Sequence, residues 1–232
     1  MKPKIGIPRL GMYNDCLKNL FKELGCEVID CPPVTKKTSQ IGCRHINELF
    51  CYPAKVVLGS MVELLDKGAE EIVMYVTQNP MCRFQTYPIL QKQILEDLGY
   101  DFKMHHLTLG SLLKDIKKVC GRSKWKIMFQ LYKTYKEIKE IENKRKQELE
   151  HGDIKIGVIG ETYCMWEDKV NMYLFDKLKS HGAAVFNSFY ITDFCKSEFE
   201  DLFKHGQIKK KSKKYLPIKD FPGHAKHSIE NT

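Results

Sequence analysis

The sequence lacks the features of a membrane or secreted protein. No stretch approaches the roughly 18 consecutive apolar residues of a membrane-spanning helix. The first residues, Met1–Ile7, lead into a strand-like pattern without the apolar core of a signal peptide. We therefore expect a cytoplasmic protein with no membrane segment.

Several catalytic motifs are missing as well. The chain contains no Cys-x-x-Cys pair, no Gly-x-Gly-x-x-Gly fingerprint, no Walker lysine and no serine-hydrolase, kinase or paired-carboxylate signature. ATP hydrolysis by the chain itself is therefore not expected. The residues alone leave open whether the protein is an enzyme.

Alternating strand and helix patterns fill the first part of the chain. Apolar strand-like runs are separated by helical patterns that end at glycine, and the runs lie at 4–8, 27–31, 72–76 and 102–106. This order predicts a first α/β domain at residues 1–110 with a mostly parallel sheet. Residues 111–150 have a basic helical pattern and predict a helical connector.

The remainder, residues 151–232, repeats the opening order less completely. Lys155–Ile159 echoes Lys4–Pro8, and a helix and a further strand follow, which predicts a second, partial α/β domain. A two-stranded sheet is rarely stable alone. We therefore expect either another chain, in a homo- or hetero-oligomer, to complete this domain or a shortened version of a longer protein.

The formal net charge of +9 does not by itself predict nucleic-acid binding. The basic residues of the connector are interspersed with glutamates, which is typical of a solvated helix face. The other cluster, Lys209–Lys214, lacks interleaved aromatics and resembles a flexible basic loop. A nucleic-acid partner is therefore not expected.

Two of the nine cysteines, Cys51 and Cys82, lie in loops beside prolines within the stretch 47–87. Ligands of parallel sheets collect at the carboxyl ends of the strands, and both loops are predicted there. Thiolates suit zinc and iron-sulfur clusters. Because the spacing of Cys43, Cys51 and Cys82 matches no zinc finger, a metal site and a set of free thiols both stay open. Four other cysteines lie within or beside apolar helix or strand patterns and are interpreted as small hydrophobic residues, namely Cys16, Cys26, Cys120 and Cys195.

The second domain contains one further candidate, the turn Gly157–Thr162. Its Gly160 and Glu161 follow a strand and precede a helix, an arrangement in which backbone N–H groups attract anions. An ordinary tight turn explains the glycines equally well. The turn is therefore a candidate cofactor-binding element.

Several segments resemble the CoA-substrate-specific enzyme activase-related, or CoA protein activase, family, which is akin to the 2-hydroxyacyl-CoA dehydratase subunits. The most specific are the Cys-x-Pro-x-Lys turn at Cys51–Lys55 and the Met-Cys-Arg-Phe turn at 81–84. The others are Lys4–Arg9, Ile94–Phe102 and Ile156–Glu161. This resemblance implies two flavodoxin-like α/β domains with parallel sheets, the second incomplete.

The resemblance also implies a 4Fe-4S or related iron-sulfur cluster, reduced by an ATP-hydrolysing activator protein and used in radical chemistry on an acyl-CoA in an anaerobe. Cys51 and Cys82 would be ligands, and Lys55 and Arg83 would offset the cluster's negative charge. Cys164 is the first candidate for a further ligand. Its alternatives are a neighbouring subunit, a non-protein ligand, Cys31 and Cys43.

Two rival functions stay open beside this iron-sulfur hypothesis. One is a non-catalytic binding or assembly module of the same fold that has lost the cluster and needs a partner chain. The other is an enzyme with a nucleophilic thiol at Cys51 or Cys82, although no histidine or carboxylate is tied to either by pattern.

Overall fold

The computed structural model describes residues 3–76 and 83–193. The chain divides into two compact units, Met1–Thr134 and Tyr135–Thr232, and the boundary lies inside helix α6 (Lys124–Leu149). Each unit contains a parallel sheet of its own. The α/β fold class predicted from the sequence is therefore confirmed, whereas the proposed boundaries at 110 and 150 stay predictions.

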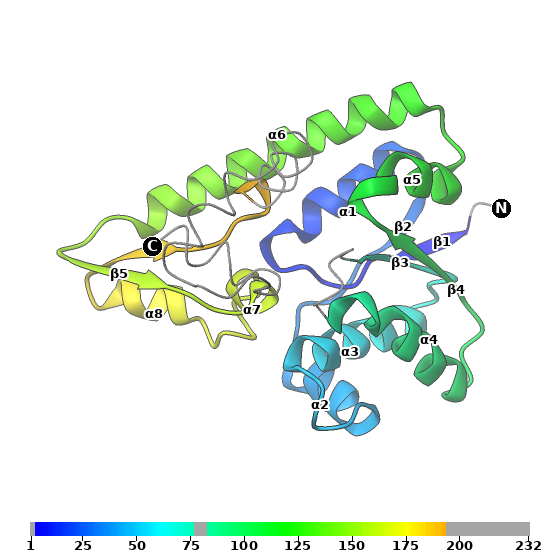
Figure 1. Cartoon of the computed structure of the whole chain (residues 1–232), viewed down its shortest axis with the longest axis horizontal. Coiled ribbons are helices and arrows are strands. Elements are labelled where there is room, and N and C mark those ends of the chain that lie inside the picture. Colours follow the sequence, from blue (N-terminus) through cyan, green and yellow to red (C-terminus); the bar gives the residue numbers. More distant parts are fainter. Residues whose placement is uncertain (1–2, 77–82, 194–232) are drawn as a thin grey trace, which may run out of the picture. The chain divides into compact units, whose positions relative to one another are not determined.

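The first unit is built on a four-stranded parallel sheet in the order β2-β1-β3-β4 (Figure 1). Its strands are β1 (Lys4–Gly6), β2 (Glu27–Ile29), β3 (Glu71–Tyr75) and β4 (Lys103–Leu107). The chain runs from β1 outward to β2, then returns past β1 to form β3 and β4. The strand order therefore reverses between β1 and β3, and this switch point is where ligands bind in open α/β sheets.

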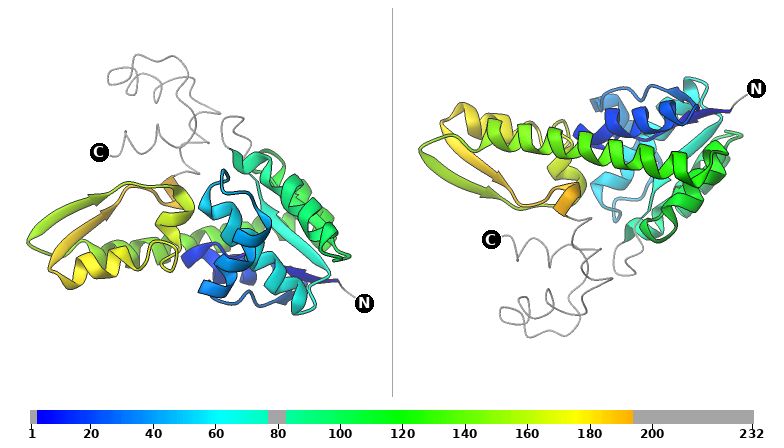
Figure 2. Two further views of the ribbon diagram at one scale, coloured as in Figure 1. Left: turned by 90° about the horizontal axis from the view of Figure 1, so that it is seen from below. Right: turned by 90° about the horizontal axis from the view of Figure 1, so that it is seen from above.

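Helices cover both faces of this sheet (Figures 1 and 2). Helices α1 (Asn14–Glu23) and α5 (Leu112–Cys120) lie on one face together with the start of α6. Helices α3 (Tyr52–Asp66) and α4 (Tyr87–Asp97) lie on the other, and α2 (Lys36–His45) packs against α3. Three short 3₁₀ turns complete the unit, at Gly11–Tyr13, Arg83–Gln85 and Leu109–Ser111.

The apolar core of the first unit explains why these elements form. Strands buried on both faces need continuous apolar runs, and helices that cover them need one apolar face. On the α1 and α5 side, strand and helix residues form one buried cluster of Ile5, Ile7, Leu20, Phe21, Leu24, Val73, Leu107, Ile116 and Ile127. On the opposite side, α3 is apolar around most of its circumference and is almost entirely buried.

Helices α2 and α3 approach so closely that two glycines are required. A Cβ atom on Gly42 would lie 1.8 Å from the carbonyl oxygen of Lys55, and one on Gly59 would lie 1.9 Å from that of Thr38. The Thr38 hydroxyl also donates a hydrogen bond of 2.9 Å to Glu63 on α3. These contacts fix the direction of α3, whose first turn follows Cys51.

The second unit contains a two-stranded parallel sheet among its described residues. Strands β5 (Ile154–Val158) and β6 (Ala183–Asn187) pair along their full length, and the short helices α7 (Thr162–Trp166) and α8 (Leu174–Ser180) connect them. Strand β6 is largely buried, whereas β5 is mostly exposed or half-buried.

Polar contacts from the second half of α6 hold this unit together. Arg145 donates to Asp168 at 3.0 Å and to Asp176 at 3.2 Å. The buried carboxylate of Glu142 accepts from the backbone N–H of Thr192 at 3.1 Å and from its hydroxyl. Among the described residues of the whole chain, no helix has the length and apolar character needed to cross a bilayer.

Candidate functional site

The start of α3 and the end of β3 lie at the carboxyl edge of the first sheet. Helix α3 leads back into β3, so its first residue, Tyr52, lies at the edge where the parallel strands end. Strand β3 ends at Tyr75 beside β1, at the point where the strand order reverses. The segment after β3 leads to Arg83, where the described chain resumes.

Cys51 occupies the N-cap position of α3. Its backbone is extended, with φ −63° and ψ 151°, and its side chain makes no capping hydrogen bond to the helix. The residue is exposed, and Pro53 in the first turn fixes the start of the helix. The first N–H groups of a helix lack intrahelical partners and carry partial positive charge. The thiol therefore lies where an anionic ligand is favoured.

Tyr87 connects this thiol to the chain segment that follows Cys82. The Tyr87 hydroxyl and the Cys51 sulfur form a hydrogen bond of 2.5 Å, and Tyr87 is the buried first residue of α4. Its ring also contacts Phe50 and Phe84, with ring centroids 6.1 and 6.0 Å apart. One aromatic side chain thus touches residues on both cysteine-bearing stretches.

A second contact holds the same two helix starts together. The buried amide of Gln91, one turn into α4, donates to the carbonyl oxygen of Ala54 at 3.0 Å. The beginnings of α3 and α4 are therefore joined by two side chains of α4. Cys82 lies outside the described residues, directly before the 3₁₀ turn Arg83–Gln85. The backbone of Arg83 belongs to that turn.

Lys55 lies one helical turn after Cys51 and is half-buried. Side chains four residues apart lie on the same side of a helix. The carbonyl oxygen of Lys55 faces Gly42 at the close contact of α2 and α3. The structure therefore groups Cys51 and Lys55 on one turn of α3.

The predicted residues of the second unit form a separate local arrangement. The Glu161 carboxylate caps α7 by accepting from the backbone N–H of Cys164 at 3.0 Å. Cys164 is half-buried, and its carbonyl oxygen accepts from the Asn171 amide at 2.9 Å. A Cβ atom on Gly160 would lie 3.1 Å from the sulfur of Met165. One N–H at this turn is thus already bound to the chain's own carboxylate. A cofactor role for Gly160 and Glu161 stays a prediction.

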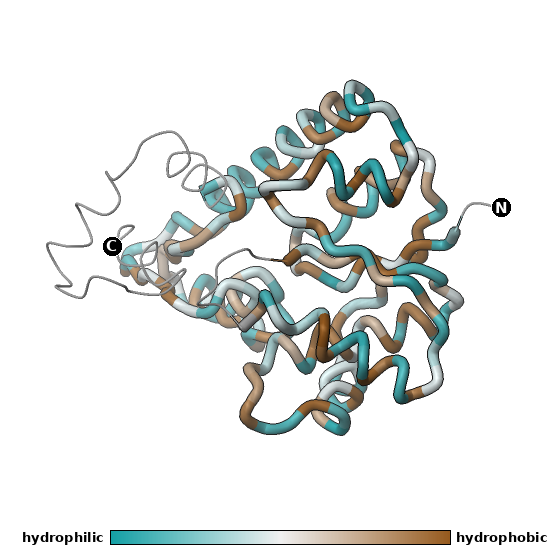
Figure 3. The backbone as a smooth tube through the Cα atoms, turned by 45° about the vertical axis from the view of Figure 1, so that its right-hand side comes forward, coloured by the Kyte–Doolittle hydropathy of each residue, from teal (hydrophilic) through white to brown (hydrophobic). Residues whose placement is uncertain are grey.

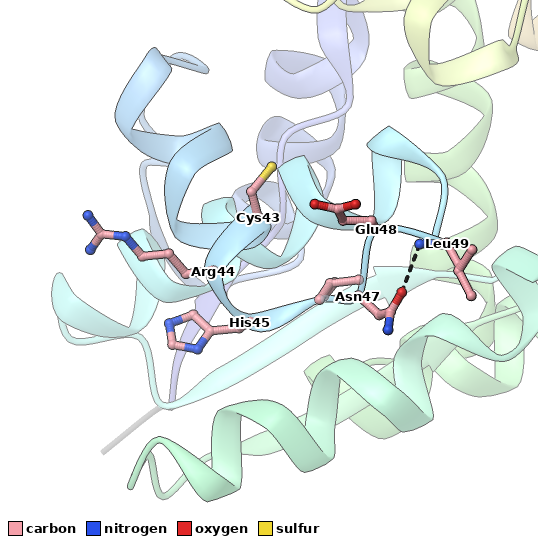
Figure 4. Close-up of a pocket in the computed structure, with 7 residues that line it drawn as sticks. Cys43, Arg44, His45, Asn47, Glu48 and Leu49 are labelled. Carbon is pink, nitrogen blue, oxygen red and sulfur yellow. Dashed lines mark hydrogen bonds between the residues drawn. The ribbon is translucent and has the colours of Figure 1, made fainter.

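The two alternative ligands of the first unit differ strongly in exposure. Cys31 follows β2 and is buried, and burial raises the pKa of its thiol to about 11. Cys43 is exposed on the last turn of α2 and lines an open hollow formed by residues 43–49 (Figure 4). In this hollow the Asn47 side chain accepts from the N–H of Leu49 at 2.9 Å, which shapes the loop before Cys51.

No group of three or more histidine, cysteine, aspartate or glutamate side chains within 3–76 and 83–193 is arranged to hold a metal ion. A cluster at Cys51 would therefore need ligands from outside these residues or a rearrangement of residues within them. The donor chemistry at Cys51 itself fits, because an exposed thiol at a helix start is available for ligation.

Comparison with known proteins identifies the chain at family level. The sequence of residues 4–190 matches the family described as the CoA enzyme activase uncharacterised domain. The chain belongs to this family. The matched segment includes Cys51, Cys82 and Cys164, so all three predicted cysteine ligands lie inside the domain. No curated protein and no solved structure matched the chain.

Sequence reasoning missed the roles of Tyr87 and Gln91. Tyr87 marks the end of the cysteine-bearing stretch in the sequence, but its contact with Cys51 spans 36 residues and has no periodic signal. A polar residue at Gln91, on the buried face of α4, is the one local hint, because buried amides need a partner.

Proposed function

We propose that this CoA enzyme activase-related domain is an iron-sulfur protein in which Cys51 and Cys82 bind one cluster. It would serve low-potential electron transfer or radical acyl-CoA chemistry. The observation that supports this most is the bridge at Tyr87, which joins the Cys51 thiol to the helix that begins five residues after Cys82. A lone exposed cysteine would give no reason to consider both loops as one site.

The surroundings of Cys51 support a thiolate-ligated group. The start of α3 favours negative charge, and Lys55 adds a cation one turn further along. The Tyr87 hydroxyl contacts the sulfur, and the rings of Phe50 and Phe84 pack against the Tyr87 ring. Burial and hydrogen bonds to ligand sulfurs are the means by which proteins set the potential of such a cluster.

Each residue has a distinct role in this proposal. Cys51 and Cys82 supply thiolates, the Tyr87 hydroxyl orients the Cys51 sulfur, and Gln91 keeps the starts of α3 and α4 together. Lys55 and Arg83 offset negative charge. When bound, an iron-sulfur cluster supplies a one-electron carrier. The remaining ligands would come from Cys164, Cys31, Cys43, a neighbouring subunit or a non-protein ligand.

The family membership supports two further parts of the proposal. An ATP-hydrolysing activator protein would deliver electrons to the cluster, because the sequence contains no ATP-hydrolysis motif of its own. An acyl-CoA would be the substrate of the chemistry that those electrons drive.

Iron and acid-labile sulfide, measured on protein purified without oxygen, test the proposal. We expect iron in the wild-type protein and a loss of most of it in Cys51→Ser and in Cys82→Ser. Cys120→Ser is the matched control, because Cys120 ends α5 at the opposite edge of the sheet, half-buried against the core. Iron-free wild-type protein from cells with intact cluster assembly would contradict the proposal. Equal iron content in the Cys51, Cys82 and Cys120 variants would contradict the assignment of Cys51 and Cys82 as ligands.

A further inference from the structure

The first part of helix α6 has apolar side chains on two opposite faces. One face packs into the first unit through Ile127, which belongs to its buried cluster, with Leu131 packed against that cluster. The other face exposes large apolar side chains on successive turns, namely Trp125, Met128, Phe129 and Tyr132. Figure 3 shows hydrophobic and hydrophilic residues interspersed along this helix. A surface helix normally needs one apolar face, so the second face calls for an explanation.

The degree of exposure distinguishes this face from scattered surface residues. Trp125 is 78% exposed, Phe129 60%, Tyr132 56% and Met128 45%. Trp125 lies four residues before Phe129, and Met128 lies four residues before Tyr132, so the four form a stripe along the helix. We call these four residues the aromatic stripe. Contiguous exposed apolar surface of this kind marks interaction sites.

The helix segment that carries the aromatic stripe is basic, and the first acidic residue after it is Glu137. Between Arg122 and Lys136 the sequence contains five basic residues and no acidic one, the others being Lys124, Lys126 and Lys133. The Lys133 ammonium lies 4.8 Å from the centre of the Phe129 ring, so a cation is part of the stripe itself. The segment therefore combines exposed apolar side chains with basic residues.

We propose that the aromatic stripe docks onto a partner protein that presents an apolar helix face bordered by aspartate and glutamate. Trp, Tyr, Phe and Met are the side chains enriched at the centres of protein interfaces, and Trp and Tyr dominate their binding energy. Lysines at the edge then match an acidic border. A second copy of the chain would bring two such positive stripes together, which like charges oppose.

Other occupants fit less well. The chain's own segment 194–232 contains nine lysines against five acidic residues, so its net charge has the same sign as that of residues 122–136. A membrane-bound helix usually separates its apolar and basic faces. Here the face opposite the stripe is occupied by the protein core, through Ile127. The docking surface does not depend on whether the domain binds a cluster.

A designed peptide supplies a probe with the proposed chemistry. The peptide is a helix with leucine at its a and d positions and glutamate at its e and g positions, and a matched peptide has lysine in place of glutamate. Binding is measured by calorimetry and by the emission of Trp125, the exposed one of two tryptophans. We expect the full chain to bind the glutamate peptide at least about tenfold more tightly than the lysine peptide, and less tightly at high salt.

Substitution within the stripe tests which residues make the contact. The double variant Trp125→Ser, Phe129→Ser should bind the glutamate peptide about 30-fold more weakly by calorimetry, since both residue types are typical binding anchors. Ile89→Ser on α4 is the control, because Ile89 is also exposed, at 71%, but lies outside the stripe. Thermal unfolding followed by circular dichroism should show that both variants keep the wild-type fold.

Several results would overturn this assignment. They are no binding of the glutamate peptide by the wild-type chain, equal binding of both peptides, or unchanged binding by the double variant. Phosphatidylserine vesicles and oligouridine are tested alongside. If either binds through Trp125 and Phe129 while the glutamate peptide does not, the stripe belongs to a membrane or RNA surface and the proposal is wrong.

Discussion

The two units use the same kind of parallel strand pairing but bury it to different degrees. In the first unit, helices cover both faces of a four-stranded sheet, and β3 is buried along its centre. In the second, β5 is mostly exposed or half-buried, and the described strands number two. There, Glu142 and Arg145 of α6 form hydrogen bonds with Thr192, Asp168 and Asp176. The two units can therefore be compared through one close contact in the first, Gly42 against Lys55, and one buried hydrogen bond in the second, Thr192 to Glu142.

The largest expected effect tests the close packing of the first unit. Gly42→Ala places a methyl group against the Lys55 carbonyl, so α2 must move away from α3. We expect the free energy of unfolding to fall by about 3 kcal/mol, as overpacking in a tight core typically costs. Urea denaturation followed by circular dichroism measures it.

Gly157→Ala in β5 is the matched control for this substitution. A Cβ atom there meets no atom within 4 Å. Its effect should therefore stay within about 0.5 kcal/mol, as for most surface substitutions. Equal losses in the two variants would contradict the contrast between the units.

Thr192→Val tests the hydrogen bonding of the second unit. It removes the hydroxyl that donates to the buried Glu142 carboxylate and keeps the side-chain shape. We expect a loss of about 2 kcal/mol, because a buried charge loses a hydrogen bond. Thr192→Ser retains the hydroxyl and should lose clearly less. Wild-type stability of Thr192→Val in urea denaturation would show that this contact is not important.

The contributions of two aspartates, Asp115 and Asp168, to the free energy of unfolding should change with pH in opposite directions. Burial pushes the pKa of Asp115 upward, but hydrogen bonds from Ser111 and the Thr108 N–H prevail and lower it. In the second unit, burial raises the pKa of Asp168 despite the attraction of Arg145. Asp115 therefore stabilises the fold above its unfolded pKa of about 3.8, and this stabilisation is lost as the pH falls through the lowered folded value. Protonated Asp168 stabilises the fold fully at a pH below its unfolded pKa of about 3.8. This stabilisation is lost as the pH rises through the raised pKa of the folded state.

Asn variants at both positions, unfolded in urea from pH 7 to pH 3, test this contrast. At pH 7 Asp115→Asn should cost about 1 kcal/mol, since asparagine keeps an acceptor oxygen but not the charge. The advantage of the wild type over Asp115→Asn should shrink on acidification, whereas its advantage over Asp168→Asn should grow. Parallel pH dependences for the two variants would contradict the assignment.

The smallest effect concerns two of the cysteines considered as a further ligand, Cys31 and Cys164. The Cys31 thiol is buried with a pKa raised to about 11, so it stays protonated near pH 8. Cys164 is half-buried in the second unit. We expect iodoacetamide to label Cys164 before Cys31 in native protein, as measured by mass spectrometry of the peptides. Faster labelling of Cys31 would show that the first unit opens more readily than its packing suggests.

Local patterns predicted most of the fold because the elements depend on local chemistry. Pro53 near the start and Gly68 after the end define α3, and the apolar run at 72–76 corresponds closely to β3. The order β2-β1-β3-β4 follows from pairing between distant segments, and the sequence does not encode it in any local period. The exposed face of α6 was not predicted either, since Trp125 and Ile127 look equally apolar in sequence.

The candidate site was predictable only in part. The loop position of Cys51 follows from its proline and the helix after it, and the structure places it at the edge of the sheet as expected. The contact with Tyr87 depends on how α3 and α4 pack, which no spacing rule describes. The predicted roles of Lys55, Arg83 and Cys164 stay predictions.

The central claim is that Cys51 and Cys82 belong to one site, and iron content in a double-variant cycle tests it most directly. Iron per chain is measured in anaerobically purified wild-type protein, Cys51→Ser, Cys82→Ser and the double variant. If both thiols bind one cluster, each single variant should lose nearly as much iron as the double variant, because ligands that act as a unit are not additive. Losses that sum to the double-variant loss, or iron that persists in the double variant, would contradict a shared site.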